Sequence, residues 1–162
     1  RLHPNDRKRI VRALEVFQQT GKTISKHNRE TRALPLRYDA LTLSLAFQRR
    51  EDMWARIDRR VDEMMAAGLA EEVRALLDSG VPVRCTAMQA IGYKEMAAAL
   101  RGGGDVCAAA EEIKLRSRQY AKRQLTWFRR TEGAKWLFWG PEPDFEAACR
   151  TSTKYLEEFG LV

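Results

Sequence analysis

The stretch best suited to chemistry is Lys114 to Arg130, KLRSRQYAKRQLTWFRR. It contains no Gly, Pro or acidic residue, so we predict one continuous helix over 114–130. Its seven basic residues are Lys114, Arg116, Arg118, Lys122, Arg123, Arg129 and Arg130. At about 100° per residue, one side of this helix takes Ala121, Leu125 and Phe128. The opposite side takes Arg116, Gln119, Arg123, Thr126, Trp127 and Arg130.

The charge pattern of this helix has two interpretations. A solvated helix face usually mixes signs, because like charges repel at i, i+4 spacing. Here cations follow one another, with an amide, a hydroxyl and an indole between them, which suits phosphate neutralisation and contact with an unstacked base. The alternative is a basic helix whose cations pair with acids elsewhere in the fold. Spacing favours nucleic-acid binding and leaves both interpretations open.

Composition supports a folded, basic protein. The 162 residues fit one domain or a large piece of one, and a 44% hydrophobic content is enough for a core. Lys and Arg number 29 against 22 acids, and the net charge of +7 favours a polyanionic partner. Cys85, Cys107 and Cys149 are too scattered for a disulfide framework or a metal knuckle, which indicates reduced cytosolic thiols. No apolar run approaches the roughly 20 residues of a membrane span, so we expect a cytoplasmic protein.

The remaining pattern predicts a helix-dominated α/β chain with few strands. Expected helices cover residues 7–20, 49–67, 69–79, 86–100, 105–130 and 144–159. Expected strands are Tyr38 to Phe47 and Lys135 to Trp139. The first is uncharged from Ala40 onward, which is typical of a strand covered on both faces, and we expect its neighbours to lie outside this sequence. Residues 22–37 are predicted to be a connection with a short helical turn at 23–27.

Cations near the start of the first helix are a second candidate site. Lys8, Arg9 and Arg12 lie in its first turns, where positive charge opposes the helix dipole. An external anion could justify that cost, or the cations could pair with Asp6 and Glu15. The sequence does not decide between these explanations.

A third candidate lies on the helix expected over 49–67. Arg56 and Arg60 form an i, i+4 pair beside an apolar stripe. They could be solvated charges pairing with Asp52 and Glu63, which spacing favours, or a two-pronged anion clamp.

Gly92 interrupts the helical pattern predicted after Thr86, at a cost of ~1 kcal/mol relative to Ala. It could allow another group to approach the backbone closely, or it could allow packing against a neighbouring helix.

Catalytic motifs are missing from this sequence. It has no G-x-x-x-x-G-K-[ST] loop and no H-E-x-x-H motif, and its two histidines, His3 and His27, suggest no nucleophilic arrangement. We therefore assign no catalytic residue and no metal ligand in this chain. The sequence starts at Arg1 and leads at once into an amphipathic helix, so we expect it to derive from a longer protein.

Four segments of the sequence resemble the tRNA dimethylallyltransferases, also called tRNA isopentenyltransferases. Three of them are the blocks RLHPNDRKRIVRALEVFQQTGK, MQAIGYKEM and AKRQLTWFRR, and the fourth is RVDEMMAAGLAEEVRALL. The resemblance implies transfer of a dimethylallyl group from dimethylallyl diphosphate to N6 of the adenosine 3′ of the tRNA anticodon. It implies a P-loop-NTPase-like, nucleotide-binding (ATP-binding) core with a helical insertion. This chain resembles the C-terminal portion, without the P-loop and the general base. Residues 1–37 would end the insertion and connect it to the core, and residues 38–162 would form the C-terminal part of the core with tRNA-binding helices.

The resemblance also implies roles for particular residues. Those expected to contact the tRNA anticodon stem-loop are Lys8, Arg9, Ile10, Val11, Arg12, Gln89, Ala90, Ile91, Gly92, Tyr93, Lys94, Lys122, Arg123, Gln124, Leu125, Thr126, Trp127, Phe128 and Arg129. Arg56 and Arg60 are expected to help hold the diphosphate. Mg²⁺ would be bound mainly by the missing half, the intact enzyme would be monomeric, and the isolated chain is expected to be inactive. The alternative is a stand-alone, non-catalytic RNA-binding module.

Overall fold

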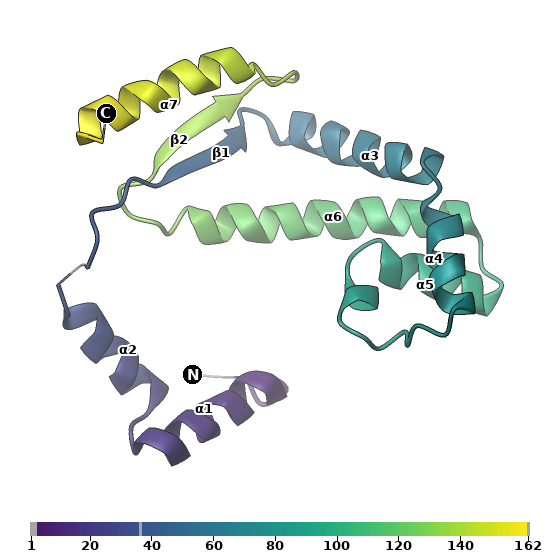
Figure 1. The fold of residues 1–162 in the computed structure, drawn as a ribbon, viewed down its shortest axis with the longest axis horizontal. Helices are drawn as coiled ribbons and strands as arrows, with labels where there is room; N and C mark the ends of the chain where they lie inside the picture. Colours follow the sequence, from purple (N-terminus) through teal and green to yellow (C-terminus); the bar gives the residue numbers. More distant parts are fainter. Residues whose placement is uncertain (1–2, 36, 162) are drawn as a thin grey trace. The chain divides into compact units, whose positions relative to one another are not determined.

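The computed structural model describes residues 3–35 and 37–161 of the chain. Its contacts divide the chain into two compact units, Arg1–Ala40 and Leu41–Val162. The described residues form seven α-helices, one short 3-10 helix and two parallel β-strands (Figure 1), which confirms the prediction of a helix-dominated chain with few strands. Among these helices, none combines the length and apolarity needed to cross a bilayer.

The first unit is a pair of helices, α1 (Arg7–Thr20) and α2 (Ile24–Ala33). Gly21 ends α1 in the left-handed conformation, with φ of 66°. Thr23 caps α2 by accepting from the Lys26 amide at 3.3 Å. The prediction of only a short turn over 23–27 was wrong, because the cap is followed by a full helix that a Lys22–Glu30 ion pair of 2.7 Å also supports.

The second unit contains a two-stranded parallel sheet. Strands β1 (Leu43–Phe47) and β2 (Lys135–Trp139) pair in register, with Leu45 opposite Leu137. Helix α7 (Phe145–Phe159) packs on β2 and begins at Asp144, which accepts from the Ala147 amide at 2.9 Å. Figure 1 shows α7 lying along β2.

Two predictions about β1 were wrong. Its neighbour β2 lies within this chain, at a distance in sequence that local patterns do not reveal. The strand is also shorter than the predicted 38–47 and is not fully covered, since Leu45 is 55% exposed. The prediction from the uncharged run therefore gave a longer and more buried strand than the structure has.

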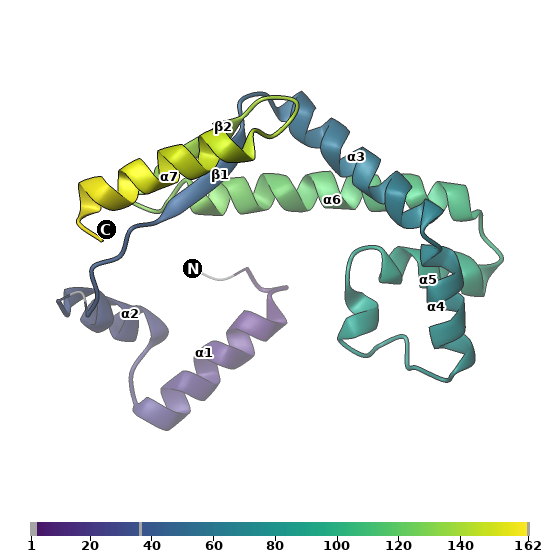
Figure 2. The same cartoon turned by 45° about the horizontal axis from the view of Figure 1, so that its top comes forward.

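The core of the second unit lies among four helices (Figure 2): α3 (Arg50–Ala66), α4 (Leu69–Asp78), α5 (Tyr93–Gly102) and α6 (Val106–Phe128). Its buried side chains are Val61, Leu69, Ala70, Val73, Met88, Met96, Ala97, Ala109 and Ile113. Asp105 caps α6 by accepting from the Cys107 amide at 2.8 Å. The predicted helix over 114–130 is therefore the C-terminal part of a longer helix that ends at Phe128.

The segment before α5 differs from the prediction. We expected one helix from Thr86, but the chain forms a 3-10 turn, Ala87–Gln89, and starts α5 only at Tyr93. Gly92 separates the two with φ of 103°, a value that side-chain-bearing residues rarely adopt. Its amide donates to Glu95 Oε2 at 2.9 Å. Gly92 thus begins α5. We call residues 89–94 the loop at 89–94; they run from the end of the 3-10 turn to the first residues of α5.

Candidate nucleic-acid interface

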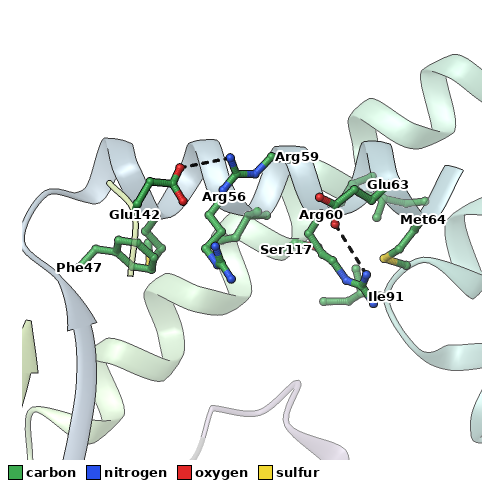
Figure 3. A pocket seen from close by; sticks show the side chains of 13 residues that line it. Phe47, Arg56, Arg59, Arg60, Glu63, Met64, Ile91, Ser117 and Glu142 are labelled. Carbon is green, nitrogen blue, oxygen red and sulfur yellow. Dashed lines mark hydrogen bonds and ion pairs between the residues drawn. The ribbon is translucent and has the colours of Figure 1, made fainter. Parts of the chain in front are cut away.

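An arginine-rich cavity of about 680 Å³ borders α3 (Figure 3), and we call it the arginine cavity. Arg56, Arg59 and Arg60 supply its positive charge. Its apolar lining includes Met53, Ile57, Met64, Ile91 and Ile113. The cavity therefore combines guanidinium groups with a hydrocarbon surface.

The three arginines differ in their partners. Arg59 reaches Glu142 at 3.4 Å, and Arg60 reaches Glu63 at 3.9 Å. Both pairs are exposed, and exposed pairs are weak. Within residues 3–35 and 37–161, no ion pair is formed by Arg56. Arg59 was not predicted as a site residue, although it lies three residues after Arg56 in the same predicted helix.

A second cavity, of about 660 Å³, joins two blocks that are far apart in sequence, and we call it the loop cavity. Gln89, Ile91 and Lys94 line it from the loop and the start of α5. Arg116, Gln119 and Arg123 line it from α6. Ile91 also lines the arginine cavity, so the two cavities share one side chain.

The C-terminal end of α6 carries a shallow depression of about 270 Å³. Its lining residues are Lys122, Arg123, Thr126, Trp127 and Arg130. Trp127 is 66% exposed and stands edge-on to Phe128, with ring centroids 5.3 Å apart. The Thr126 hydroxyl is already used within the helix, where it donates to the Lys122 carbonyl at 2.9 Å.

The cations of α6 fall into two groups, and each group fits one interpretation of the sequence. In the N-terminal half, Arg116 pairs with Glu112 at 2.6 Å, Arg118 with Asp58 at 2.7 Å, and Lys114 with Asp62 at 2.7 Å. The hydrogen bonds that Lys114 donates to Asp62 and, with a smaller effect, to Glu111 raise the pKa of Lys114 above its ordinary value. The cations in the C-terminal half of α6 and directly after it have no ion pair among the described residues: Lys122, Arg123, Arg129 and Arg130.

The residues predicted over 122–129 are distributed around α6. Gln124 is exposed, as are Trp127 and its neighbour Phe128. Leu125 and Arg129 instead line a cavity of about 620 Å³ near Phe47 and Trp136. The block therefore faces more than one direction.

Two residues of the 89–94 block are engaged within the chain. A Cβ at Gly92 would lie 3.7 Å from Met64 Cε, so the core already occupies the space beside this glycine. The Tyr93 hydroxyl donates to Glu72, and that hydrogen bond raises the pKa of Tyr93. Ala90 and Lys94 are exposed. Packing within the chain accounts for Gly92 without an external group.

The first unit carries the remaining predicted block on α1. Arg9 pairs with Asp6 at 3.3 Å and Arg12 with Glu15 at 3.4 Å, as the local explanation predicts. Both arginines remain largely exposed, with 76% and 67% of their side chains accessible. Such pairs contribute little and leave the guanidinium groups open to a phosphate. In the same block, Lys8 and Val11 are exposed and Ile10 is half-buried.

The described residues bring together no group of three His, Cys, Asp or Glu side chains that could hold a metal ion.

The fold is shared with solved transferases. A full-length tRNA isopentenylpyrophosphate transferase from Bacillus halodurans matches with a TM-score of 0.71 and 34% identity, over 98% of this chain and 46% of that one. A eukaryotic dimethylallyltransferase, crystallised acting on tRNA, matches with a TM-score of 0.72 and 28% identity, over 96% of this chain and 40% of that one. The fold thus places the chain in the class of these solved transferases.

Sequence comparison gives the family. The IPP transferase family model matches residues 1–131, and the chain belongs to this family. It is 50% identical over 137 residues to tRNA dimethylallyltransferase 1 of Trichlorobacter lovleyi, covering 85% of this chain and 45% of that protein. It is 43% identical over 162 residues to the tRNA dimethylallyltransferase of Syntrophomonas wolfei, covering 99% of this chain and 51% of that protein. The chain spans about half the length of these relatives, and the predicted family is confirmed.

Proposed function

We propose that this chain is the tRNA-binding part of a tRNA dimethylallyltransferase, which moves a dimethylallyl group from dimethylallyl diphosphate to N6 of the adenosine 3′ of the anticodon. The observation that carries the proposal is the loop cavity. There the loop at 89–94 meets a side of α6 that carries Arg116, Gln119 and Arg123, and Ile91 connects them to the arginine cavity. Three carboxylates also line the loop cavity: Glu95, Asp105 and Glu112.

The loop cavity has the groups that an RNA loop requires. An adenine inside a stacked loop cannot present N6 to an allylic carbon, so it must be flipped out, at a cost of a few kcal/mol. Lys94 and Arg123 are suited to the phosphates beside the flipped nucleotide, and Gln119 is suited to a base edge. Contacts of this kind offset the cost of flipping.

The arginine cavity has the groups that a prenyl diphosphate requires. Arg56 and Arg60, with Arg59, would stabilise the negative charge that develops as diphosphate leaves. The apolar lining around Ile57 and Ile91 suits a hydrocarbon chain. Mg²⁺, when bound by other parts of the enzyme, would supply further charge neutralisation.

The proposal is tested with RNA hairpins that carry the anticodon loop. The chain should bind a hairpin with adenosine 3′ of the anticodon more tightly than the same hairpin with uridine there, as measured by fluorescence anisotropy. With tRNA and dimethylallyl diphosphate, the chain alone should transfer no prenyl group, since its sequence has no P-loop motif. Equal affinity for the two hairpins, or no binding at low salt, would contradict the proposal.

One observation favours the second candidate, a stand-alone RNA-binding module. This candidate predicts that β1 pairs within the chain, and β1 does pair with β2. It also predicts a cooperative thermal melt, whereas a part of a larger enzyme should melt with poor cooperativity and self-associate. Differential scanning calorimetry with light scattering separates the two.

A further inference from the structure

Two ion pairs cross between α3 and α6, one helical turn apart. Arg118 Nη1 donates to both carboxylate oxygens of Asp58, at 2.9 and 2.7 Å. Lys114 Nζ lies 2.7 Å from Asp62 Oδ1. We call these two pairs the α3–α6 ladder. The spacing of four residues on each helix, in opposite directions along the chain, shows that the helices run antiparallel at the ladder.

The cations of the ladder are less exposed than Arg116 of α6, whereas its carboxylates, Asp58 and Asp62, are 31% and 62% exposed. The side chains of Lys114 and Arg118 are 13% and 29% exposed, against 53% for Arg116 in its pair with Glu112. Removing Asp58 would leave the part-buried guanidinium of Arg118 without its bidentate partner, so this pair penalises other arrangements of the two helices. Apolar contacts lack this directionality.

The ladder fixes the rotation of α6 about its own axis. With Arg118 directed toward α3, helix geometry places Gln119, Arg116 and Arg123 roughly 100 to 160° around the helix. These three side chains line the loop cavity. A change in the rotation of α6 would turn them away from the loop at 89–94.

The ladder also fixes the rotation of α3 about its own axis, and with it the side chains of the arginine cavity. Arg56 and Arg60 lie two residues before and after Asp58, roughly 160° around the helix on either side. Ile91 lines both cavities. The ladder therefore sets how the arginines of α3 and the cationic side of α6 are oriented toward Ile91.

We infer that Asp58, Asp62, Lys114 and Arg118 are positioning residues, whose two ion pairs align the arginine cavity with the loop cavity so that a diphosphate donor and an RNA acceptor can meet. The inference rests on the proposed function for its ligands. It assigns Lys114 and Arg118 to alignment rather than to contact with RNA.

The alignment can be measured without any ligand. Spin labels are placed on Cys107 of α6 and on Ala55→Cys of α3, both at exposed positions, with Cys85 and Cys149 replaced by Ala. The labelled chain should give one narrow distance distribution in pulsed electron resonance. Asp58→Asn with Asp62→Asn should broaden or shift it, and Glu146→Gln on α7, which breaks an exposed pair, should not. An unchanged distribution in the folded Asp58→Asn/Asp62→Asn variant would overturn the inference.

The effect on RNA is measured with the anticodon hairpin. Asp58→Asn should weaken hairpin binding by about two- to thirtyfold, the range by which residues linking two sites modulate affinity. The charge exchange Asp58→Arg with Arg118→Asp should restore the hairpin affinity to within about twofold of the wild-type value. It should also narrow the distance distribution again. If Arg118 contacted RNA directly, the exchange would weaken binding further, and that result would also overturn the inference.

The two proposals fail separately. A wild-type chain that binds no hairpin contradicts the proposed function, while the distance measurement still decides whether the ladder aligns α3 and α6. Should Asp58→Asn/Asp62→Asn not fold, the charge exchange is the deciding variant: it must fold and restore the wild-type distance.

Discussion

Trp127 is the most exposed aromatic side chain on α6, at 66%, and the cations Lys122, Arg123 and Arg130 surround it in the shallow depression. Most of this indole is left in water among cations, where its face can stack on an unpaired base. At the residue scale, Trp127 is therefore the side chain most suited to stacking on RNA.

Trp127→Ala should weaken binding of the anticodon hairpin by about 1–3 kcal/mol, the cost of losing one base–aromatic stack. Trp127→Phe should retain part of the affinity, because a smaller ring still stacks. Phe145→Ala is the control, since Phe145 is 62% exposed on α7, away from the depression. Equal affinities for wild type and Trp127→Ala in anisotropy titrations would exclude stacking by this residue.

Tyr93 and Glu72 give a residue-scale prediction about pH. The hydrogen bond to Glu72 raises the pKa of Tyr93, so Tyr93 is bound to its proton more tightly in the folded state than in the unfolded state. Its contribution to the free energy of unfolding is therefore complete below the unfolded pKa of about 10 and is lost as the pH rises through the folded pKa.

The difference in unfolding free energy between wild type and Tyr93→Phe should stay constant up to about pH 10 and shrink above it. Urea titrations monitored by circular dichroism at several alkaline pH values measure this difference. A difference that stays constant throughout the alkaline range would show that the hydrogen bond to Glu72 does not hold the Tyr93 proton.

At the element scale, the loop at 89–94 depends on Gly92. With φ of 103°, Gly92 turns the chain from the 3-10 segment into α5, and its amide bonds to Glu95 as the helix begins. The loop's position beside α6, and hence the loop cavity, depends on this turn.

Gly92→Ala should lower the free energy of unfolding by about 1–3 kcal/mol, the cost of placing a side chain in a sparsely populated backbone region. Contact adds little, since the new Cβ would lie 3.7 Å from Met64, an ordinary distance. Gly102→Ala, at the end of α5 with open space around it, is the matched control and should be neutral or slightly stabilising. Urea denaturation of both variants measures the change in the free energy of unfolding. Equal changes in the two variants would show that the backbone at Gly92 is not strained by a side chain.

Helix α6 also shows, at the element scale, what sequence patterns can predict. Its span, its Asp105 cap and its basic character follow from local residues, and all are present in the structure. Whether a particular cation is paired does not follow, because Asp58 and Asp62 lie on another helix. Periodicity predicts faces, and only tertiary packing determines which face meets which partner.

At the scale of the whole molecule, the described residues confirm most predicted helices and the strand 135–139. The pairing of β1 with β2 was missed because α3 to α6 separate the strands in sequence. The two cavities were likewise beyond prediction, since each joins residues from separate elements. The residue sets were taken from the family resemblance, and their tRNA and diphosphate roles remain predictions.

The two compact units carry different parts of the proposed surface. The α1 block belongs to the first unit, whereas the loop cavity, the arginine cavity and the depression belong to the second. The cations without ion pairs at the C-terminal end of α6 therefore give the second unit a cationic surface of its own.

The most direct test of the account measures how strongly the chain binds the anticodon hairpin when three of these cations are removed. Lys122→Ala/Arg123→Ala/Arg129→Ala is compared with Arg101→Ala/Arg150→Ala/Lys154→Ala, which has the same net charge but loses exposed cations elsewhere. The account predicts a large loss of affinity only in the first variant, and a salt dependence of log K reduced by about 0.7 to 0.9 per lost contact. Equal affinities for the two variants would contradict the assignment of the α6 surface to RNA binding.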